Sequence, residues 1–345
     1  MSAWLPPFDQ ILEKTHVVSL PLLVPFRGIT VREVMLITGN ERVGEWAAFP
    51  EYSGEVAARW LAAALEQTYA SGFSAAVHSS EPVSVNATFP ALSSDQIPDW
   101  WKRFPGVHSA KVKVAEPASN PTADYERVEA VRNVVGEEVR LRLDANGRWS
   151  LDQAEKALSE LSQFSIDYVE QPVATVSDML ELKRRLNGSG IRLAADELIR
   201  ESDGLEEIIS LGAADVAVLK VSPLGGIDTT LEIARRAHSA GLDVVLSSAL
   251  ETSVGLSWGI RAATLLRQEF GSLSDAGLGT SVFFAQDVVV NPITVIDGAV
   301  TVDEPEVDVC KVRALAASTE RTQWWQERMK RCLPLAVDIL ESHKG

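Results

Sequence analysis

Cysteine and histidine are scarce in this 345-residue sequence, and neither occurs in a metal-binding or catalytic motif. Cys310 and Cys332 are the only cysteines, and neither belongs to a C-x-x-C pair. Their number and spacing exclude a disulfide framework and a cysteine-ligated zinc site. The five histidines stand in no motif, and Ser247 and Ser248 have no adjacent histidine that would make them nucleophiles. We interpret both cysteines as incidental thiols in a reducing compartment.

Long apolar runs and basic clusters are also missing. No apolar stretch approaches the roughly 20 residues that a membrane span needs, and residues 1–10 lack a basic region followed by an apolar one. The 32 basic and 48 acidic residues give a formal charge of −16, which argues against nucleic-acid binding. We therefore expect a cytoplasmic globular protein that acts on a small molecule, with no membrane or nucleic-acid partner.

What the sequence does contain, from about residue 95, is an alternation of short β-rich runs and helical stretches, which is typical of parallel βα units. The expected strands are 84–89, 110–114, 139–145, 166–171, 191–197, 215–221, 243–249 and a weak eighth at 276–280. Among the helices, one begins with a capping-box pattern at Ser150 and Gln153, and another covers 228–240. Eight runs predict an α/β fold, a modified TIM barrel of the form (β/α)7β.

The segments on either side of this barrel have a different pattern. Residues 31–40 and 43–49 resemble an antiparallel hairpin, and residues 54–70 resemble a helix. Near the other end, residues 293–305 resemble a further hairpin, and the last thirty residues are helical. We expect residues 1–82 and a C-terminal tail of 291–345 to form one α+β capping domain around a barrel of 83–290.

Three acidic residues close consecutive predicted strands at equal spacing. Glu170 follows Asp144 by 26 positions, and Asp196 follows Glu170 by 26. Taken singly, each fits a turn or a helix start. Equal steps of one strand plus one helix would bring all three to the same end of neighbouring parallel strands. Three oxygen ligands without histidine or cysteine suit Mg²⁺ or Mn²⁺ rather than zinc, so the pattern predicts a divalent metal site.

Lysines lie on the predicted strands on either side of this acidic group. Lys111 and Lys113 are two apart on one predicted strand and therefore share a face. If that face is inside the barrel, each lowers the pKa of the other, and one can act as a general base. The alternative is an exposed edge strand with both lysines in solvent. Lys220 ends the sixth strand, so Lys113 and Lys220 would face each other across the barrel with the carboxylates between them.

Polar and small residues at the same strand ends are candidates for binding substrate. Arg142 shares a strand face with Asp144, where it can pair with the acidic cluster, bind substrate or serve as a structural charge. The last two strands end in serines and glycines, whose hydroxyls and backbone amides can bind a carboxylate. The predicted substrate-binding residues are Arg142, Asn146, Ser247, Ser248, Gly277 and Gly279.

The order of these motifs resembles that of the enolase superfamily, in particular its muconate-lactonising-enzyme-like subgroup. The motifs are K-x-K at 111–113, D-x-N at 144–146, E-Q-P at 170–172, D-E at 196–197 and Lys220 on the next strand. The resemblance covers nearly the whole chain. Each motif is common in unrelated proteins, whereas the five in this order are specific.

Within that subgroup the chain is most similar to the o-succinylbenzoate synthase family. The shared features are RLDAN at 142–146, SSALETSVG at 247–255 and GLGT at 277–280. The chain lacks the D-x-D that dipeptide epimerases of the subgroup carry on the eighth strand. It also has Ser247 where mandelate-racemase-like members have a histidine.

The resemblance implies a mechanism. Asp144, Glu170 and Asp196 would hold Mg²⁺, which would bind a substrate carboxylate and stabilise an enediolate. Lys113 would remove the proton beside that carboxylate and return it to a departing hydroxyl. Lys220 would stabilise the intermediate from the opposite face, and Lys111 would belong to the same catalytic group.

The implied reaction is dehydration of 2-succinyl-6-hydroxy-2,4-cyclohexadiene-1-carboxylate to 2-succinylbenzoate in menaquinone biosynthesis. The resemblance also implies that residues 25–30 and 49–54 close the pocket. One alternative is an N-acylamino-acid racemase, dipeptide epimerase or cycloisomerase that uses the same lysines. Two others are a metal-independent aldolase with Lys220 as Schiff-base lysine, and a barrel that only binds.

Overall fold

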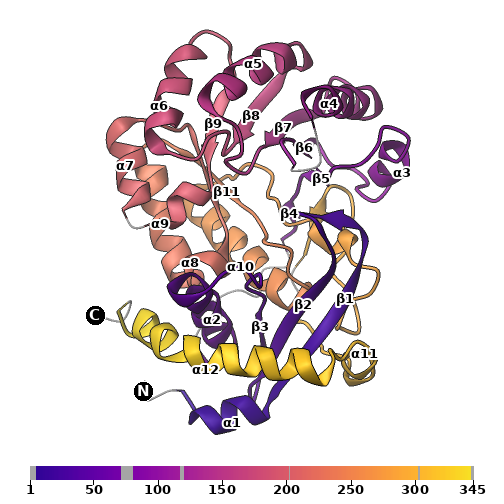
Figure 1. Cartoon of the computed structure of the whole chain (residues 1–345), viewed down its shortest axis with the longest axis vertical. Coiled ribbons are helices and arrows are strands. Elements are labelled where there is room, and N and C mark those ends of the chain that lie inside the picture. The colour runs from indigo at the N-terminus through magenta and orange to yellow at the C-terminus, as the bar shows by residue number, and fades with distance from the viewer. Residues whose placement is uncertain (1–4, 71–80, 117–119, 202, 302–303, 343–345) are drawn as a thin grey trace.

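The computed structural model describes residues 5–70, 81–116, 120–201, 203–301 and 304–342. A barrel built on one curved parallel sheet occupies the upper part of Figure 1, and a smaller α+β unit lies below it. The predicted fold class, a modified TIM barrel with an α+β capping unit, is confirmed by this arrangement. The residue boundaries proposed for the domains stay a prediction.

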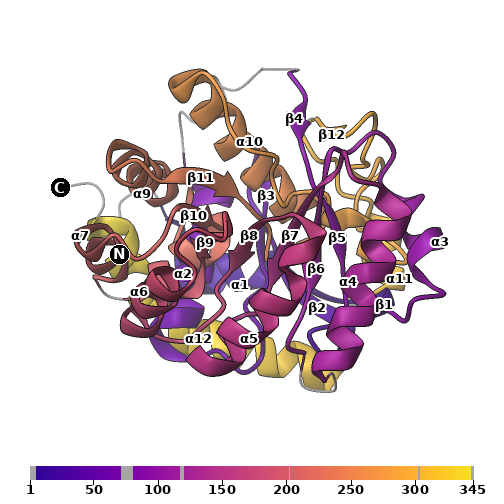
Figure 2. The same cartoon turned by 90° about the horizontal axis from the view of Figure 1, so that it is seen from above.

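The parallel sheet has seven strands in sequential order, and Figure 2 shows how they curve round the barrel. The strands are β5 (Ala87–Phe89), β6 (Ser109–Lys113), β7 (Arg140–Asp144), β8 (Ile166–Glu170), β9 (Arg192–Ala195), β10 (Val216–Leu219) and β11 (Asp243–Leu246). Runs such as VAVL in β10 are buried along their whole length, as expected for strands covered on both faces. Six of the eight predicted strands therefore lie where the sequence places them.

Helices follow the strands of the sheet, and most of them cover its outer face. They are α3 (Ile97–Trp101), α4 (Pro121–Val135), α5 (Leu151–Leu161), α6 (Val176–Arg185), α7 (Gly204–Leu211), α8 (Val221–Leu224), α9 (Ile227–Ser239) and α10 (Ser253–Phe270). The predicted capping box is present at the start of α5. The Ser150 Oγ accepts a hydrogen bond from the backbone N–H of Gln153 at 3.3 Å, and the Gln153 side chain accepts one from the N–H of Ser150 at 2.9 Å.

The two ends of the sheet differ from the prediction. Residues 84–89 do not form one strand, because β4 (Val83–Ser84) pairs with β12 (Ala299–Val300) and only β5 joins the barrel. Residues 276–280 form no regular strand. Instead, Ala276 forms backbone hydrogen bonds with the 84–86 segment and Gly277 forms them with the end of β11, which closes the barrel. Short loops and glycines leave too few consecutive residues for a regular eighth strand.

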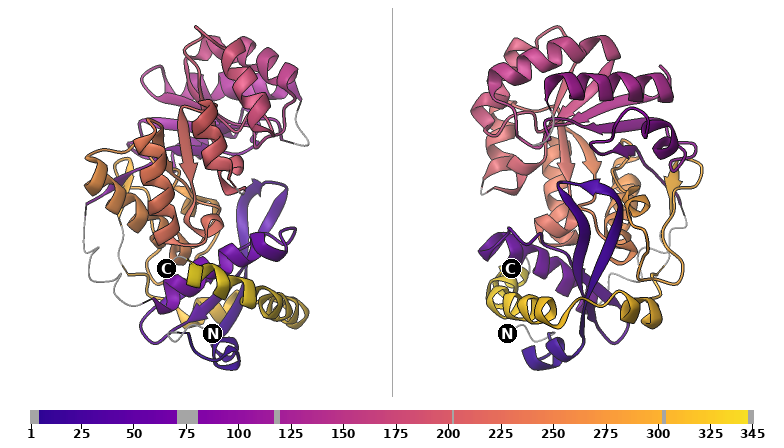
Figure 3. Two further views of the ribbon diagram at one scale, coloured as in Figure 1. Left: turned by 90° about the vertical axis from the view of Figure 1, so that its left-hand side faces the viewer. Right: turned by 45° about the vertical axis from the view of Figure 1, so that its right-hand side comes forward.

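The capping unit combines both ends of the chain. Its sheet has the order β1 (Thr15–Phe26), β2 (Ile29–Thr38) and β3 (Val43–Trp46), and its helices are α1 (Phe8–Glu13), α2 (Gly54–Tyr69), α11 (Val309–Ala314) and α12 (Thr319–Ser342). The predicted hairpin and the helix at 54–70 are confirmed by β2, β3 and α2. Helix α12 packs against α2 and β1, and Figure 3 shows the β1–β2 hairpin rising from this unit towards the barrel.

The predicted C-terminal hairpin is correct only in its turn. Ile296 and Ala299 form one antiparallel bridge around Asp297 and Gly298, both of which have positive φ. The following strand, β12, pairs with β4 beside the barrel. In the part of the chain that the structure describes, no helix is long and apolar enough to cross a membrane.

Candidate active site

Charged side chains from neighbouring strands meet at the carboxyl ends of the barrel strands. The parallel register pairs Lys113 of β6 with Asp144 of β7, and Asp144 with Glu170 of β8. Residues that are register partners in adjacent strands point to the same face of the sheet. All three are buried, with at most 5% of their surface exposed. The sequence parity that predicted inward-facing lysines and acids is therefore reproduced in the structure.

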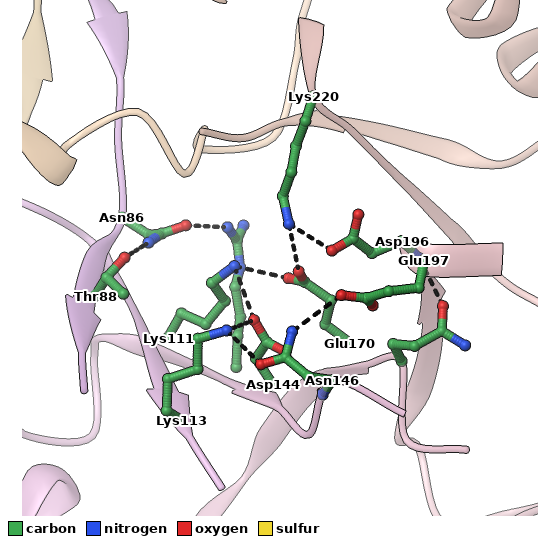
Figure 4. Close-up of polar contacts among 12 residues, drawn as sticks. Asn86, Thr88, Lys111, Lys113, Asp144, Asn146, Glu170, Asp196, Glu197 and Lys220 are labelled. Atoms are coloured by element: carbon green, nitrogen blue, oxygen red, sulfur yellow. Dashed lines mark hydrogen bonds and ion pairs between the residues drawn. The ribbon is translucent and has the colours of Figure 1, made fainter. Parts of the chain in front are cut away.

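The lysines and carboxylates form one ion-pair network (Figure 4). Lys111 Nζ lies 2.8 Å from Glu170 Oε2 and 3.4 Å from Asp144 Oδ2. Lys113 Nζ lies 2.6 Å from Asp144 Oδ2. From the other side of the carboxylates, Lys220 Nζ lies 2.5 Å from Asp196 Oδ2 and 3.8 Å from Glu170 Oε1. Because Lys111 and Lys220 each contact two acids, the three carboxylates converge.

The position of Asp196 depends on the loops that follow β8 and β9. Gln171 is fully buried, and its Oε1 accepts hydrogen bonds from the backbone N–H groups of Asp196 at 3.0 Å and Leu198 at 3.2 Å. The Arg200 guanidinium donates to Asp196 Oδ1. The glutamine of E-Q-P thus aligns the start of the next acidic motif, a role that sequence reasoning did not assign.

The donor set suits a hard divalent cation, although ammonium groups contact the carboxylates here. Among the described residues, no group of three or more His, Cys, Asp or Glu side chains has a metal-holding arrangement. Glu170 Oε1 is buried and accepts no hydrogen bond from a described residue. A buried carboxylate oxygen without a donor, beside two further carboxylates, is chemically suited to Mg²⁺ or Mn²⁺. The residues therefore fit such an ion.

The two lysines of K-x-K differ in the direction of their pKa shifts. Burial lowers the pKa of Lys113 below its usual value, and the charges of Lys111 and Lys220 act in the same direction. Burial also disfavours the charged form of Lys111, but Glu170 and Asp144 together raise its pKa. Burial raises the pKa of Glu170 to about 7. Lys111 is thus held as a cation, and Lys113 is shifted towards the neutral amine that a general base requires.

Lys113 is fixed by neighbours other than the acids. Its Nζ donates to Asn146 Oδ1 at 2.7 Å, and Asn146 Nδ2 donates to Glu197 Oε1 at 3.2 Å. The Phe26 ring of the capping unit covers this amine, with its centre 5.5 Å from Nζ. Asn146 therefore connects the lysine to the D-E motif, a contact beyond the substrate-binding role predicted for it.

A small cavity of about 40 Å³ lies over this network. Of the predicted site residues, those that line it are Lys111, Lys113, Asp144, Asn146, Lys220, Ser247, Ser248 and Gly277. A Cβ atom on Gly277 would lie 2.4 Å from Ser247 Oγ, so a larger residue here would displace the Ser247 hydroxyl. Ser248 Oγ lies 2.6 Å from Thr280 Oγ1, which places two hydroxyls side by side on this wall.

Arg142 and Gly279 are not among the residues that line the cavity. Arg142 is 1% exposed, and its Nη1 donates to the Asp275 carbonyl at 2.7 Å while its guanidinium covers the Tyr168 ring. It lies one pleat before Asp144, so its side chain fills the barrel interior beneath the site. Gly279 packs against Val295. Neither residue borders the cavity, so the geometry does not favour their substrate-binding roles, which stay a prediction.

Sequence reasoning missed most of the opposite wall. The capping unit contributes Phe26, Arg27, Phe49 and Trp60 to the cavity. The barrel adds four lining residues that the sequence did not indicate, namely Thr88 of β5, Arg200, Ala249 and Leu250. Phe26 and Arg27 lie in the 25–30 loop and Phe49 in the 49–54 segment, the two regions that the family resemblance implied. Trp60 lies inside α2, where an apolar residue at helical spacing looks like any other core residue.

Comparison with known proteins agrees with this architecture. The enolase N-terminal domain-like family matches residues 17–68, and the enolase C-terminal domain-like family matches residues 100–306. The fold is similar to that of a muconate lactonizing enzyme from Pseudomonas fluorescens, with a TM-score of 0.71, 20% identity and coverage of 88% of this chain and 98% of the other. It is also similar to an N-succinyl Arg/Lys racemase from Bacillus cereus, with a TM-score of 0.69, 19% identity and coverage of 88% and 97%.

A curated relative is much more similar in sequence. The o-succinylbenzoate synthase of Mycobacterium marinum is 45% identical over 327 residues, which cover 94% of this chain and 95% of the relative. The family matches and this relative confirm the resemblance predicted from the five motifs. The chain belongs to the o-succinylbenzoate synthase family of the enolase superfamily.

Proposed function

We propose that this enzyme dehydrates 2-succinyl-6-hydroxy-2,4-cyclohexadiene-1-carboxylate to 2-succinylbenzoate. The observation that carries the proposal is the placement of Lys113 and Lys220 on opposite sides of three buried carboxylates. The name of the M. marinum relative supports the substrate and the reaction. The product is aromatic, which makes the elimination favourable once the first proton has been removed.

Lys113 is the proposed base. The neutral amine takes the proton from C1 of the substrate, beside the carboxylate, and the C1–H electrons form the enediolate. The resulting ammonium then gives that proton to the hydroxyl on C6, the C6–O bond breaks and water departs. Because one lysine serves both steps, the proton and the hydroxyl leave from the same face. Its hydrogen bonds to Asp144 and Asn146 fix the amine during both transfers.

Lys220 and Lys111 supply fixed positive charge. Lys220 approaches from the opposite side and stabilises the negative charge that develops on the substrate carboxylate. Lys111 contacts Glu170 and Asp144 and so offsets the repulsion between two buried carboxylates. Asp144, Glu170 and Asp196 would hold the Mg²⁺ or Mn²⁺ ion. That ion, when bound, supplies Lewis-acid stabilisation of the carboxylate's charge.

The remaining walls bind the substrate and exclude water. The hydroxyls of Ser247 and Ser248 can donate hydrogen bonds to the succinyl chain. Phe26 and Phe49 cover the cavity from the capping unit. A cover of aromatic rings keeps water from the enediolate and strengthens the electrostatic interactions inside the cavity.

The test is an assay of 2-succinylbenzoate formation with Mg²⁺, in which the wild type is compared with Lys113→Ala. The matched control is Lys102→Ala, because the Lys102 side chain, just after the end of α3, is 74% exposed. We expect product from the wild type and the control and none above background from Lys113→Ala. An inactive wild type would refute the proposed substrate, and an active Lys113→Ala would refute the proposed base.

A second candidate is proton exchange at the α-carbon of an N-acylamino acid, because lysines on both faces can exchange a proton. This reaction needs both Lys113 and Lys220 as acid and base, whereas the dehydration needs only Lys113. Deuterium incorporation from solvent into N-succinylamino acids, without dehydration of the cyclohexadiene, would favour it. The aldolase alternative needs Lys220 as a free nucleophile, but Lys220 is ion-paired with Asp196 and Glu170.

A further inference from the structure

Arg32 of β2 lies at the junction between the capping unit and the barrel. Only 1% of its surface is exposed. Its Nε donates to the Leu250 carbonyl at 3.1 Å, and its Nη2 donates to the carbonyls of Ala47 and, at 3.4 Å, Ala249. Its guanidinium carbon lies 3.9 Å from the centre of the Phe49 ring. One side chain therefore contacts two segments that are distant in sequence, residues 47–49 and 249–250.

Both segments contribute to the substrate cavity. Phe49 belongs to its capping wall, and Ala249 and Leu250 belong to its barrel wall. Arg32 itself is not among the residues that line the cavity, so it does not touch the reacting groups. Any effect of Arg32 on catalysis therefore acts through the positions of these two walls.

The barrel segment is a turn that needs external support. Leu250 has a φ of 66°, a left-handed conformation that is unfavourable for a residue with a branched side chain. Glu251 accepts a hydrogen bond from the Ala249 N–H at 2.6 Å and another from Ser222 Oγ at 3.0 Å. Arg32 holds the carbonyls of the same turn. Such a conformation persists only where its surroundings fix it from several sides.

The guanidinium of Arg32 is suited to this role in a way that lysine is not. The hydrogen bonds of Arg32 go to backbone carbonyls. A planar fork can donate to carbonyls of two different segments at once, whereas an ammonium is a compact point charge. Burial lowers the pKa of Arg32 to about 10, so it remains charged at neutral pH.

We propose that Arg32 is a positioning residue that closes the capping wall onto the barrel wall of the substrate cavity and fixes the turn at residues 249–251. The proposal rests on the proposed function only for its effect on substrate turnover. The coupling between the two segments is a property of the structure itself and can be measured without substrate.

Arg328 of α12 offers a matched control. It is also buried, and it donates to the carbonyls of Ala48 at 2.8 Å, Phe49 at 2.7 Å and Tyr52 at 2.7 Å. It therefore binds the same capping segment as Arg32 and forms a similar number of hydrogen bonds. Its carbonyl partners all lie in that segment, whereas those of Arg32 extend to the barrel.

The experiment compares Arg32→Lys with Arg328→Lys in the full-length protein, by amide hydrogen exchange and by steady-state kinetics. For Arg32→Lys we expect exchange at least tenfold faster in peptides covering both 47–49 and 248–252. For Arg328→Lys we expect faster exchange around 48–52 and wild-type exchange at 248–252. With substrate, Arg32→Lys should raise KM about tenfold and lower kcat less, at temperatures well below its unfolding transition.

Wild-type exchange at 248–252 in Arg32→Lys would overturn the proposal, as would equal changes there in both variants. If Arg32→Lys does not fold, Arg32→Gln provides the same comparison without a buried charge. The glutamine amide can reach only one of the two segments, so this variant also uncouples them. If the wild type lacks the dehydratase activity, the exchange measurements still decide the coupling. Failure of the proposed function and failure of this inference are thus distinguished.

Discussion

The two walls of the cavity are built in different ways. The barrel wall carries carboxylates and lysines whose positions are set by the register of parallel strands, as the Lys113–Asp144–Glu170 row shows. The capping wall carries aromatic rings such as Phe26 and Phe49, held by packing and by arginine–carbonyl hydrogen bonds. Atoms that must be placed accurately for proton transfer thus lie on the wall that backbone hydrogen bonds fix. Residues that exclude water lie on the other wall.

Loss of the base should have the largest effect on the barrel wall. We expect Lys113→Ala to lower kcat by about 10³- to 10⁴-fold, because proton transfer by a positioned base contributes an amount of this order. Product binding, measured by titration of 2-succinylbenzoate, should change much less. A variant that retains more than a tenth of the activity would contradict the division of roles between the walls.

Loss of the opposite cation should have the next largest effect. We expect Lys220→Ala to lower kcat by about 10²- to 10³-fold, a range typical of a lost electrostatic contact to a developing negative charge. If Lys220 only stabilises charge, the variant should still exchange the C1 proton of the substrate with solvent deuterium at a reduced rate. Exchange as fast as that of the wild type would show that Lys220 acts later than proton removal.

The capping wall should respond in binding more than in chemistry. We expect Phe49→Leu to raise KM about fivefold to tenfold and to change kcat little, because a smaller apolar side chain costs about 1 kcal/mol of contact. Phe8→Leu, on α1 and remote from the cavity, is the matched control. A loss in kcat as large as that of Lys220→Ala would place chemistry on the capping wall as well.

The effect expected at the junction of the walls concerns stability rather than activity. Glu45 of β3 is buried and accepts hydrogen bonds from the N–H groups of Thr252 and Gly255 at the start of α10. Burial raises the pKa of Glu45 to about 8, although these hydrogen bonds oppose the shift. An acid whose pKa is raised by folding stabilises the fold at low pH and loses that contribution as the pH rises through the folded value.

We therefore expect the free energy of unfolding to fall between about pH 5 and pH 8. Glu45→Gln should make this decrease in the free energy of unfolding smaller by on the order of 2 kcal/mol. The measurement is urea unfolding at several pH values. Glu66, whose pKa burial raises to about 7, should account for part of the remaining slope. An unchanged slope in Glu45→Gln would show that Glu45 ionises at a lower pH in the folded protein.

The sequence predicted the barrel wall better than the capping wall for a physical reason. Strand parity and repeat spacing are strict, so Lys111, Lys113 and Asp144 could be assigned to one face before the structure was known. Arg142 obeys the same parity but lies one pleat lower, and parity does not distinguish depth. The capping wall depends on long-range packing, and residues such as Trp60 carry no local sign of which surface they will cover.

The parts of the fold also differ in how accurately the sequence predicts them. Long periodic segments such as α2 and the strands β6 to β11 were predicted to within a few residues, because their pattern repeats over many positions. The region at 276–280 was not, because isolated bridges are specified by tertiary contacts rather than by a repeating pattern. The hairpin predicted for residues 293–305 shows the same limit, because its turn at Asp297 is present whereas β12 pairs with β4 instead.

The seam of the barrel has a consequence for how such an enzyme can diversify. Ala276 and Gly277 join the 84–86 segment to β11 through isolated bridges, while the strands that carry the lysines and acids are joined by continuous ladders. Segments with few backbone hydrogen bonds open at lower free energy than the rest of a fold. Substitutions near the seam can therefore reshape the side of the cavity that Ser247 and Gly277 line and leave the proton-transfer groups in place. Substrate preference can drift across a lineage while the chemical step is inherited unchanged.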